Sequence, residues 1–115
     1  MRLGAVLLVV LLGGCELINP PTTSDQALNK AIERQREARD ICLMRMIAQA
    51  PESEDAATVG AAASLACRAE NERLIDALVA EDRSGRPQIT DAILKDSVVR
   101  ATRFTMRARG AFNNS

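Results

Sequence analysis

The two cysteines on either side of Pro51, Cys42 and Cys67, constrain the fold of this chain more than any other feature. At helical spacing each cysteine falls on the apolar stripe of its own segment, and Pro51 separates the segments because proline cannot continue a helical hydrogen-bond ladder. In an antiparallel hairpin of two helices, positions equally far from the turn lie at one level. Cys42 and Cys67 are equally far from the midpoint between Glu54 and Asp55, in the acidic connector after Pro51. The sequence therefore predicts a helical hairpin with both sulfur atoms near one level.

Hydrophobic periodicity and capping residues predict three helices. The first begins near Thr23 or Ser24, with Gln26 completing a capping box, and ends before Pro51. Its apolar stripe comprises Leu28, Ala31, Ile32, Gln35, Ala38, Cys42 and Met46. The end of this helix is apolar on several sides, so we expect more than one neighbour to cover it. These apolar residues are Ile41, Leu43, Met44, Met46 and Ile47.

The second helix follows a capping Ser53 and extends to about Asp82. Its inward face comprises Ala56, Val59, Gly60, Ala63, Cys67, Asn71, Leu74 and Leu78. The third helix is capped by Thr90 and ends at Gly110. Its buried face comprises Ile93, Leu94, Ser97, Val98, Ala101, Phe104, Thr105 and Ala108. Because no β-alternating run occurs and the loops are short, the predicted fold is all-α, a small three-helix antiparallel bundle or a hairpin plus a third helix.

Two features are expected where the predicted helices meet. The small residues of the segment Gly60–Ala63 allow two helix backbones to approach closely. Gln35 and Asn71 are polar residues on the facing stripes of the first two helices. We expect them to form a hydrogen bond that sets the register of the helices, in preference to binding a ligand.

The N-terminus consists of Arg2, the uncharged apolar run Leu3–Leu12, and the small residues Gly13 and Gly14 before Cys15. Such a run is too short to span a bilayer and is typical of a secretory signal. The segment Leu12–Cys15 resembles the lipobox of bacterial lipoproteins. The resemblance implies cleavage between Gly14 and Cys15, diacylation of the Cys15 thiol and, usually, acylation of the new amino group. The alternative is an uncleaved signal anchor with an unmodified Cys15.

The lipobox resemblance also implies a location in the bacterial cell envelope. More than one acyl chain gives stable membrane anchoring. In enteric lipoprotein sorting an aspartate after the lipidated cysteine favours the inner membrane; Glu16 stands there, which favours the outer membrane. The predicted divisions are a signal peptide (1–14), the lipidated cysteine with a proline-containing tether (15–23), a helical domain (24–110) and a frayed tail (111–115).

The secretory signal changes how the remaining cysteines, Cys42 and Cys67, are interpreted. In an oxidising compartment an even pair normally forms a structural disulfide. A metal site needs more ligands than two thiols, and the chain contains no histidine. A redox pair more often has Cys-x-x-Cys spacing. We therefore expect a Cys42–Cys67 disulfide, with reactive or intermolecular thiols as the alternative.

Composition excludes several function classes. Histidine, tryptophan and tyrosine are absent, and Phe104 and Phe112 are the two aromatic residues. The chain therefore lacks the usual acid–base residue of enzymes and the aromatic platforms that stack nucleic-acid bases. Its 15 basic and 15 acidic residues balance, so no net charge attracts nucleic acid. We expect a non-enzymatic protein with no cofactor, metal, small-molecule substrate or nucleic-acid partner.

Charge is uneven at the C-terminus, where four arginines and no acid follow residue 99. Arg100, Arg103 and Arg107 share one helical stripe beside the predicted buried face. Positive charge also suits a helix C-terminus, so a solvated basic face is one interpretation. The other is contact with an acidic protein or an anionic envelope polymer, because the guanidinium fork suits carboxylate and phosphate groups. These three arginines are the candidate partner-binding residues.

These observations predict a lipid-anchored, non-catalytic interaction module on the periplasmic side of the envelope. Its role would be that of an accessory or assembly factor for an envelope protein complex. The alternative is an immunity, entry-exclusion or phage-lysis lipoprotein, which has the same appearance at this level. Outer-membrane lysis lipoproteins are typically rich in proline. This chain has only four prolines, which argues against a phage-lysis lipoprotein.

Overall fold

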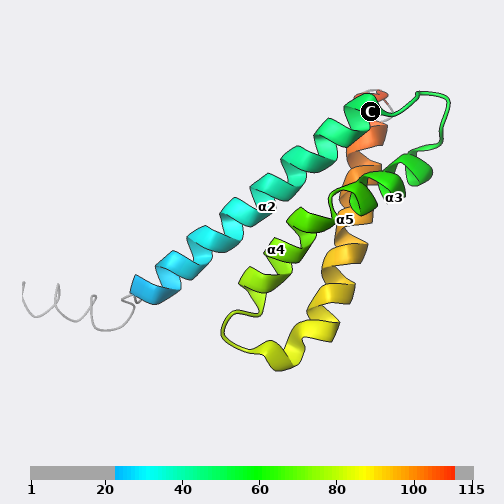
Figure 1. The fold of residues 1–115 in the computed structure, drawn as a ribbon. Coiled ribbons are helices and arrows are strands. Elements are labelled where there is room, and N and C mark those ends of the chain that lie inside the picture. Colours follow the sequence, from blue (N-terminus) through cyan, green and yellow to red (C-terminus); the bar gives the residue numbers. More distant parts are fainter. Residues whose placement is uncertain (1–22, 111–115) are drawn as a thin grey trace, which may run out of the picture.

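The structure, a computed structural model, describes residues 23–110, and every regular element in that range is helical. Four α-helices and a short 3₁₀-helix follow one another with short connections (Figure 1). In chain order these are α2 (Thr23–Gln49), α3 (Ala56–Ala66), α4 (Arg68–Leu78), η1 (Arg83–Gly85) and α5 (Arg86–Ala108). The predicted all-α class is therefore confirmed for this range. The predicted signal peptide, most of the tether and the C-terminal tail lie outside the described residues.

Helix α2 has the predicted limits. It begins at Thr23 and ends at Gln49, two residues before Pro51, which cannot donate the next backbone hydrogen bond. Its 27 residues make it the longest element of the described chain. Among residues 23–110, none of the helices has both the length and the apolar character that crossing a membrane requires.

The predicted second helix is in fact two helices, which corrects the three-helix expectation. Cys67 lies between α3 and α4 with φ −96° and ψ 27°, away from regular helical values. Its N–H still donates to the Ala63 carbonyl, and its own carbonyl accepts from the Asn71 N–H, each at 3.0 Å. The chain therefore changes direction without losing its hydrogen bonds. Helix α3 packs against α5, whereas α4 runs along α2 (Figure 1).

The expected ends of these helices also need correction. Helix α3 starts at Ala56 after Asp55, so Ser53 is not its cap, and α4 stops at Leu78, short of Asp82. Helix α5 starts at Arg86, four residues before the expected cap Thr90. The reason is Pro87, which stands in the first turn of α5, where a missing N–H costs nothing.

The core lies where α2, α3, α4 and α5 meet around the cysteines. Its buried apolar residues are Cys42, Leu43, Val59, Ala63, Cys67, Leu74, Ile75, Val79 and Ala101. The expected close approach of helices occurs at Gly60, where a Cβ atom would lie 2.8 Å from the Thr102 backbone nitrogen of α5. Three expected core positions are exposed: Ala38, Leu94 and Ala108. Arg39 is buried in place of its neighbour Ala38, because α5 supplies an acidic partner for it.

Candidate functional site

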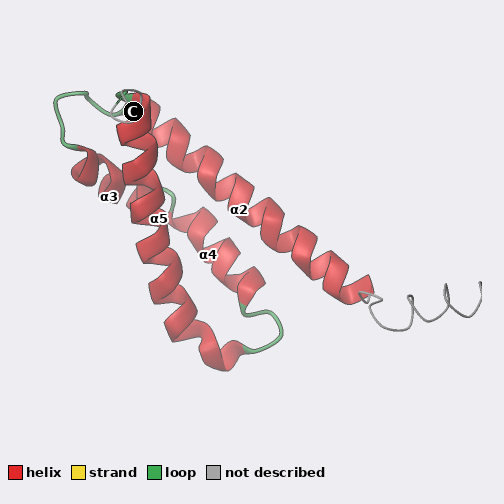
Figure 2. Cartoon of the chain, turned by 180° about the vertical axis from the view of Figure 1, so that it is seen from behind, coloured by secondary structure: helices red, strands yellow, loops and turns green. Residues whose placement is uncertain are grey.

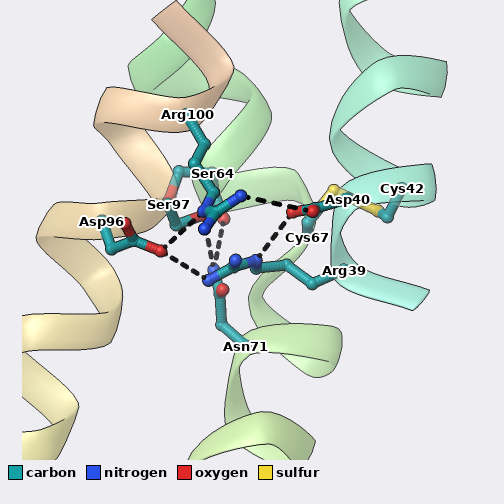
Figure 3. Close-up of polar contacts among 9 residues, drawn as sticks. All are labelled: Arg39, Asp40, Cys42, Ser64, Cys67, Asn71, Asp96, Ser97 and Arg100. Atoms are coloured by element: carbon teal, nitrogen blue, oxygen red, sulfur yellow. Dashed lines mark hydrogen bonds and ion pairs between the residues drawn. A yellow bond between two sulfur atoms is a disulfide. The ribbon is translucent and has the colours of Figure 1, made fainter. Parts of the chain in front are cut away.

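The predicted disulfide is present and ties α2 to the junction of α3 and α4. Cys42 and Cys67 have a Cα–Cα distance of 5.9 Å, and both side chains are buried. Figure 3 shows the bond between their sulfur atoms. A carboxylate oxygen of Glu70 lies within 4.8 Å of both sulfur atoms. A metal would need thiolates, and in the disulfide both sulfurs are bonded to each other. The group therefore acts as a covalent staple.

A buried arginine beside the disulfide joins α2 to α5. Only 1% of the Arg39 side chain is exposed. Its Nε donates to Asp40 Oδ1 at 3.2 Å, and its Nη1 lies 3.2 Å from Asp96 Oδ2. That second contact is an ion pair without hydrogen-bond alignment, since Nη1 has no hydrogen-bond partner among the described residues. Charge neutralisation by two carboxylates is what allows the guanidinium to be buried.

Arg100 completes the ionic cluster from the α5 side. Its Nε donates to Asp96 Oδ2 at 2.9 Å, and its Nη1 lies 3.5 Å from Asp40 Oδ2. Two arginines and two aspartates therefore alternate across the interface (Figure 3). The cluster carries no net charge and fixes how α2 and α5 meet.

Asn71 extends this polar region into the core. Its Nδ2 donates to Ser97 Oγ at 3.1 Å and to the Ser64 carbonyl at 3.4 Å, which connects α4 to α5 and α3. The expected Asn71–Gln35 pair is thus replaced by contacts with other helices. The full burial of Asn71 fits the expected role in setting helix register. Its hydrogen-bond partners differ from the expected Gln35 because α3 and α4 are separate helices.

The three arginines of the predicted basic stripe have different surroundings. Arg100 is 40% exposed and is engaged in the ionic cluster. Arg103 and Arg107 are exposed, and within residues 23–110 they form no ion pair or hydrogen bond. Contact with a partner remains a prediction for these arginines. The structure makes Arg100 a structural residue and leaves Arg103 and Arg107 available.

Arg107 borders an apolar groove between the C-terminal ends of α2 and α5. The groove has a volume of about 350 Å³. It is lined by Met44, Ile47, Ala48, Phe104, Arg107 and Ala108. Met44 is 49% exposed and Ile41, one turn earlier, is 46% exposed. The expectation that several neighbours cover this end of α2 is therefore only partly correct. We call this surface the α2–α5 groove.

A second groove lies between α3 and α5, with a volume of about 370 Å³. Its lining residues are Ala61, Ser64, Leu65, Arg68, Leu94 and Val98. Leu65 is 73% exposed, and the one arginine of this groove, Arg68, is paired with Glu72 at 3.3 Å. The two grooves thus share apolar character but differ in charge, because Arg107 of the α2–α5 groove is unpaired within the described chain.

The expected lipidation site, Cys15, lies outside the described residues. The sequence analysis did not name the α2 residues of the α2–α5 groove as candidate binding residues. The signal that could have identified them is the C-terminal end of α2, which is apolar on several sides. Comparison of the chain with protein-family models, with curated protein sequences and with solved structures gives no match.

Proposed function

We propose that this protein is a lipid-anchored, non-catalytic helical module of the bacterial envelope that binds a partner protein as an accessory or assembly factor. Anchoring rests on the lipobox resemblance that ends at Cys15. Partner binding rests on one observation, the α2–α5 groove. Exposed apolar side chains gathered in one concave surface and bordered by polar groups are typical of protein interaction sites.

The surroundings of the groove support a binding role. The Cys42–Cys67 disulfide and the Arg39 ionic cluster lie on the side of α2 that faces the core, next to the groove residues Met44 and Ile47. Both devices hold α2 in place against its neighbours. A surface held in this way loses little conformational entropy on binding, which favours affinity.

Two measurements test this function. Intact-mass analysis of the membrane-extracted protein should show a chain that begins at Cys15 and carries acyl mass; a chain beginning at Met1 would contradict anchoring. A photoreactive amino acid at Met44 should form a discrete adduct with an envelope protein in living cells. The same group at exposed Arg34, on the other half of α2, is the control. No adduct at Met44, or equal adducts at both positions, would contradict the binding role.

A further inference from the structure

We propose that the α2–α5 groove takes an acidic amphipathic helix of the partner protein. Apolar side chains of that helix would enter the groove, and carboxylates on its two flanks would pair with arginines on the two rims. The inference rests on the proposed function, because it names the chemistry of the partner at the same site.

The floor of the groove suits one apolar stripe of a helix. It is formed by Met44 and Ile47 of α2 and by Phe104 of α5, with the small residues Ala48 and Ala108 at one end. Two helices that meet at an angle leave a concave channel, and an amphipathic helix fills such a channel with side chains at positions i, i+3, i+4 and i+7. Methionine adapts to different apolar shapes, which suits a recognition surface.

Arginines border both sides of this floor. On α2, exposed Arg45 follows Ile41 by four residues and precedes Ala48 by three, which places it on the outer side of the apolar stripe. On α5, Arg107 lines the groove and Arg103 lies one turn earlier on the outer face. None of these three arginines makes an ion pair or hydrogen bond within the described chain.

The acidic residues near the groove do not neutralise these rims. Asp40 and Asp96 are held by Arg39 and Arg100 in the ionic cluster. Exposed Glu37 precedes Ile41 by one helical turn, and Glu52 follows the end of α2, so both lie toward the ends of the channel. The sides are basic and the floor is apolar, which is the complement of a helix with an apolar stripe between two acidic flanks.

An anionic membrane is the other occupant that an apolar and basic surface suggests. The position of the groove favours a protein. Met44 lies near the end of α2 that is remote from Thr23, about 30 Å along the helix at ~1.5 Å per residue. The chain enters α2 at Thr23, so the proposed lipid anchor would join the helix at the end remote from the groove. The concave shape also fits a helix better than a flat bilayer.

Binding of synthetic helical peptides to the purified full-length protein tests the inference. The protein is held in phosphatidylcholine nanodiscs, with empty nanodiscs as the blank. One peptide carries leucines at i, i+3, i+4 and i+7 flanked by glutamates; the second replaces every glutamate by lysine. Fluorescence anisotropy gives the affinities, and NMR chemical shifts locate the binding. We expect the glutamate peptide to bind about tenfold or more tightly than the lysine peptide and to shift the signals of Met44 and Ile47.

Variants assign the effect to the groove. The double substitution R103E/R107E should weaken binding of the glutamate peptide about tenfold, because each rim pair contributes up to ~1 kcal/mol. The matched double substitution R34E/R36E changes the same charge on the other half of α2 and should leave the affinity unchanged. Met44→Glu should weaken binding, whereas Leu65→Glu in the α3–α5 groove should not. Circular dichroism of each variant checks that it stays helical.

Other outcomes overturn the inference in different ways. Equal binding of both peptides at the groove would reject the acidic partner and leave the proposed binding role intact. Binding of neither peptide, or equal losses in R103E/R107E and R34E/R36E, would also reject it. Tight binding to phosphatidylglycerol vesicles that R103E/R107E abolishes, with no peptide binding, would assign the surface to the membrane. Photo-crosslinking at Met44 reports separately on the proposed function.

Discussion

The two halves of α2 carry similar apolar stripes and have very different surroundings. From Asp25 to Ala38 no residue is buried, although Leu28 and Ile32 lie on the stripe. In the second half Arg39, Cys42 and Leu43 are all buried. Figures 1 and 2 show the reason: α5 lies close to the C-terminal end of α2 and diverges from α2 toward the N-terminal end of α2. Periodicity states which side of a helix is apolar, and the neighbours decide how much of that side is buried.

The difference has a functional side. The α2–α5 groove belongs to the well-packed half of α2, where α5, the disulfide and the ionic cluster hold the helix. The first half, packed mainly along α4, is the part that leads toward Thr23 and the predicted tether. Under the proposed function, a recognition surface at the well-packed end and a loosely covered arm toward the predicted anchor would let the protein reach its partner without losing the shape of its groove.

Removal of the disulfide should give the largest loss of stability. Cys42 and Cys67 are 25 residues apart in sequence, and closing a loop of that length restricts the unfolded chain by about 3.5 kcal/mol. We expect C42A/C67A to lose about that much free energy of unfolding in urea. Hydrogen exchange should show the greatest loss of protection in the second half of α2. A loss below about 1 kcal/mol would show that the disulfide adds little to the free energy of unfolding.

Truncation of one leucine in each half of α2 tests the comparison directly. Leu43 is fully buried in the core, so Leu43→Ala should cost about 3 kcal/mol. Leu28 is only partly buried, and Leu28→Ala should cost about 1 kcal/mol or less. Both changes are made in the same helix with the same residue types, so helix propensity cancels. Equal losses in urea denaturation would contradict the difference between the halves.

Close packing of α3 against α5 predicts that Gly60→Ala destabilises the protein. Alanine is the better helix former by ~1 kcal/mol, but its methyl group would overlap the Thr102 side chain and approach the Thr102 backbone. Overpacking should outweigh propensity, with a net loss of about 1–2 kcal/mol. Gly85→Ala is the control, because a Cβ there meets nothing within 4 Å. If Gly60→Ala raised the melting temperature, the close approach would be contradicted.

Local signals in the sequence predicted much of the fold. The start of α2 at Thr23, its end before Pro51 and the end of α5 at Ala108, just before Gly110 with φ 79°, all follow from caps and breakers. The Cys42–Cys67 disulfide was expected from an even cysteine pair behind a secretory signal, and hairpin geometry placed the two sulfur atoms near one level. The division of the second predicted helix at Cys67 could not be predicted in this way. Both backbone hydrogen bonds of Cys67 are kept, and the hydrophobic periodicity continues across it. The change in direction depends on α3 packing against α5 and α4 against α2.

The candidate site was only partly predictable for the same reason. The unpaired charge of Arg103 and Arg107 was visible as an excess of arginine near the C-terminus. Burial of Arg39 was not, because it needs Asp96, which lies far along the chain on α5. The same tertiary contact removes Arg100 from the available stripe and places it beside Asp40. Sequence spacing shows which residues share one face of a helix. It does not show which charged side chains on that face pair with opposite charges on a second helix.

Asp82 should give the smallest effect, at the connection between α4 and α5. The Ser84 hydroxyl and then the Ser84 backbone N–H donate to the Asp82 carboxylate and lower its pKa from the ordinary value of 3.8. A lowered folded pKa stabilises the fold above pH 3.8, and this contribution is lost as the pH falls through the folded value. Carbon-13 NMR titration should therefore give a pKa below 3.8 for Asp82.

Ser84→Ala removes the hydroxyl donor and should raise that pKa toward 3.8, while the backbone donor keeps part of the shift. Because this turn lies at the far end of α5 from the α2–α5 groove, the signals of Met44 and Ile47 should not change in the variant. A change there would mean that the connection between α4 and α5 is coupled to the α2–α5 groove, against the expectation that the well-packed half of α2 keeps its shape when distant turns change.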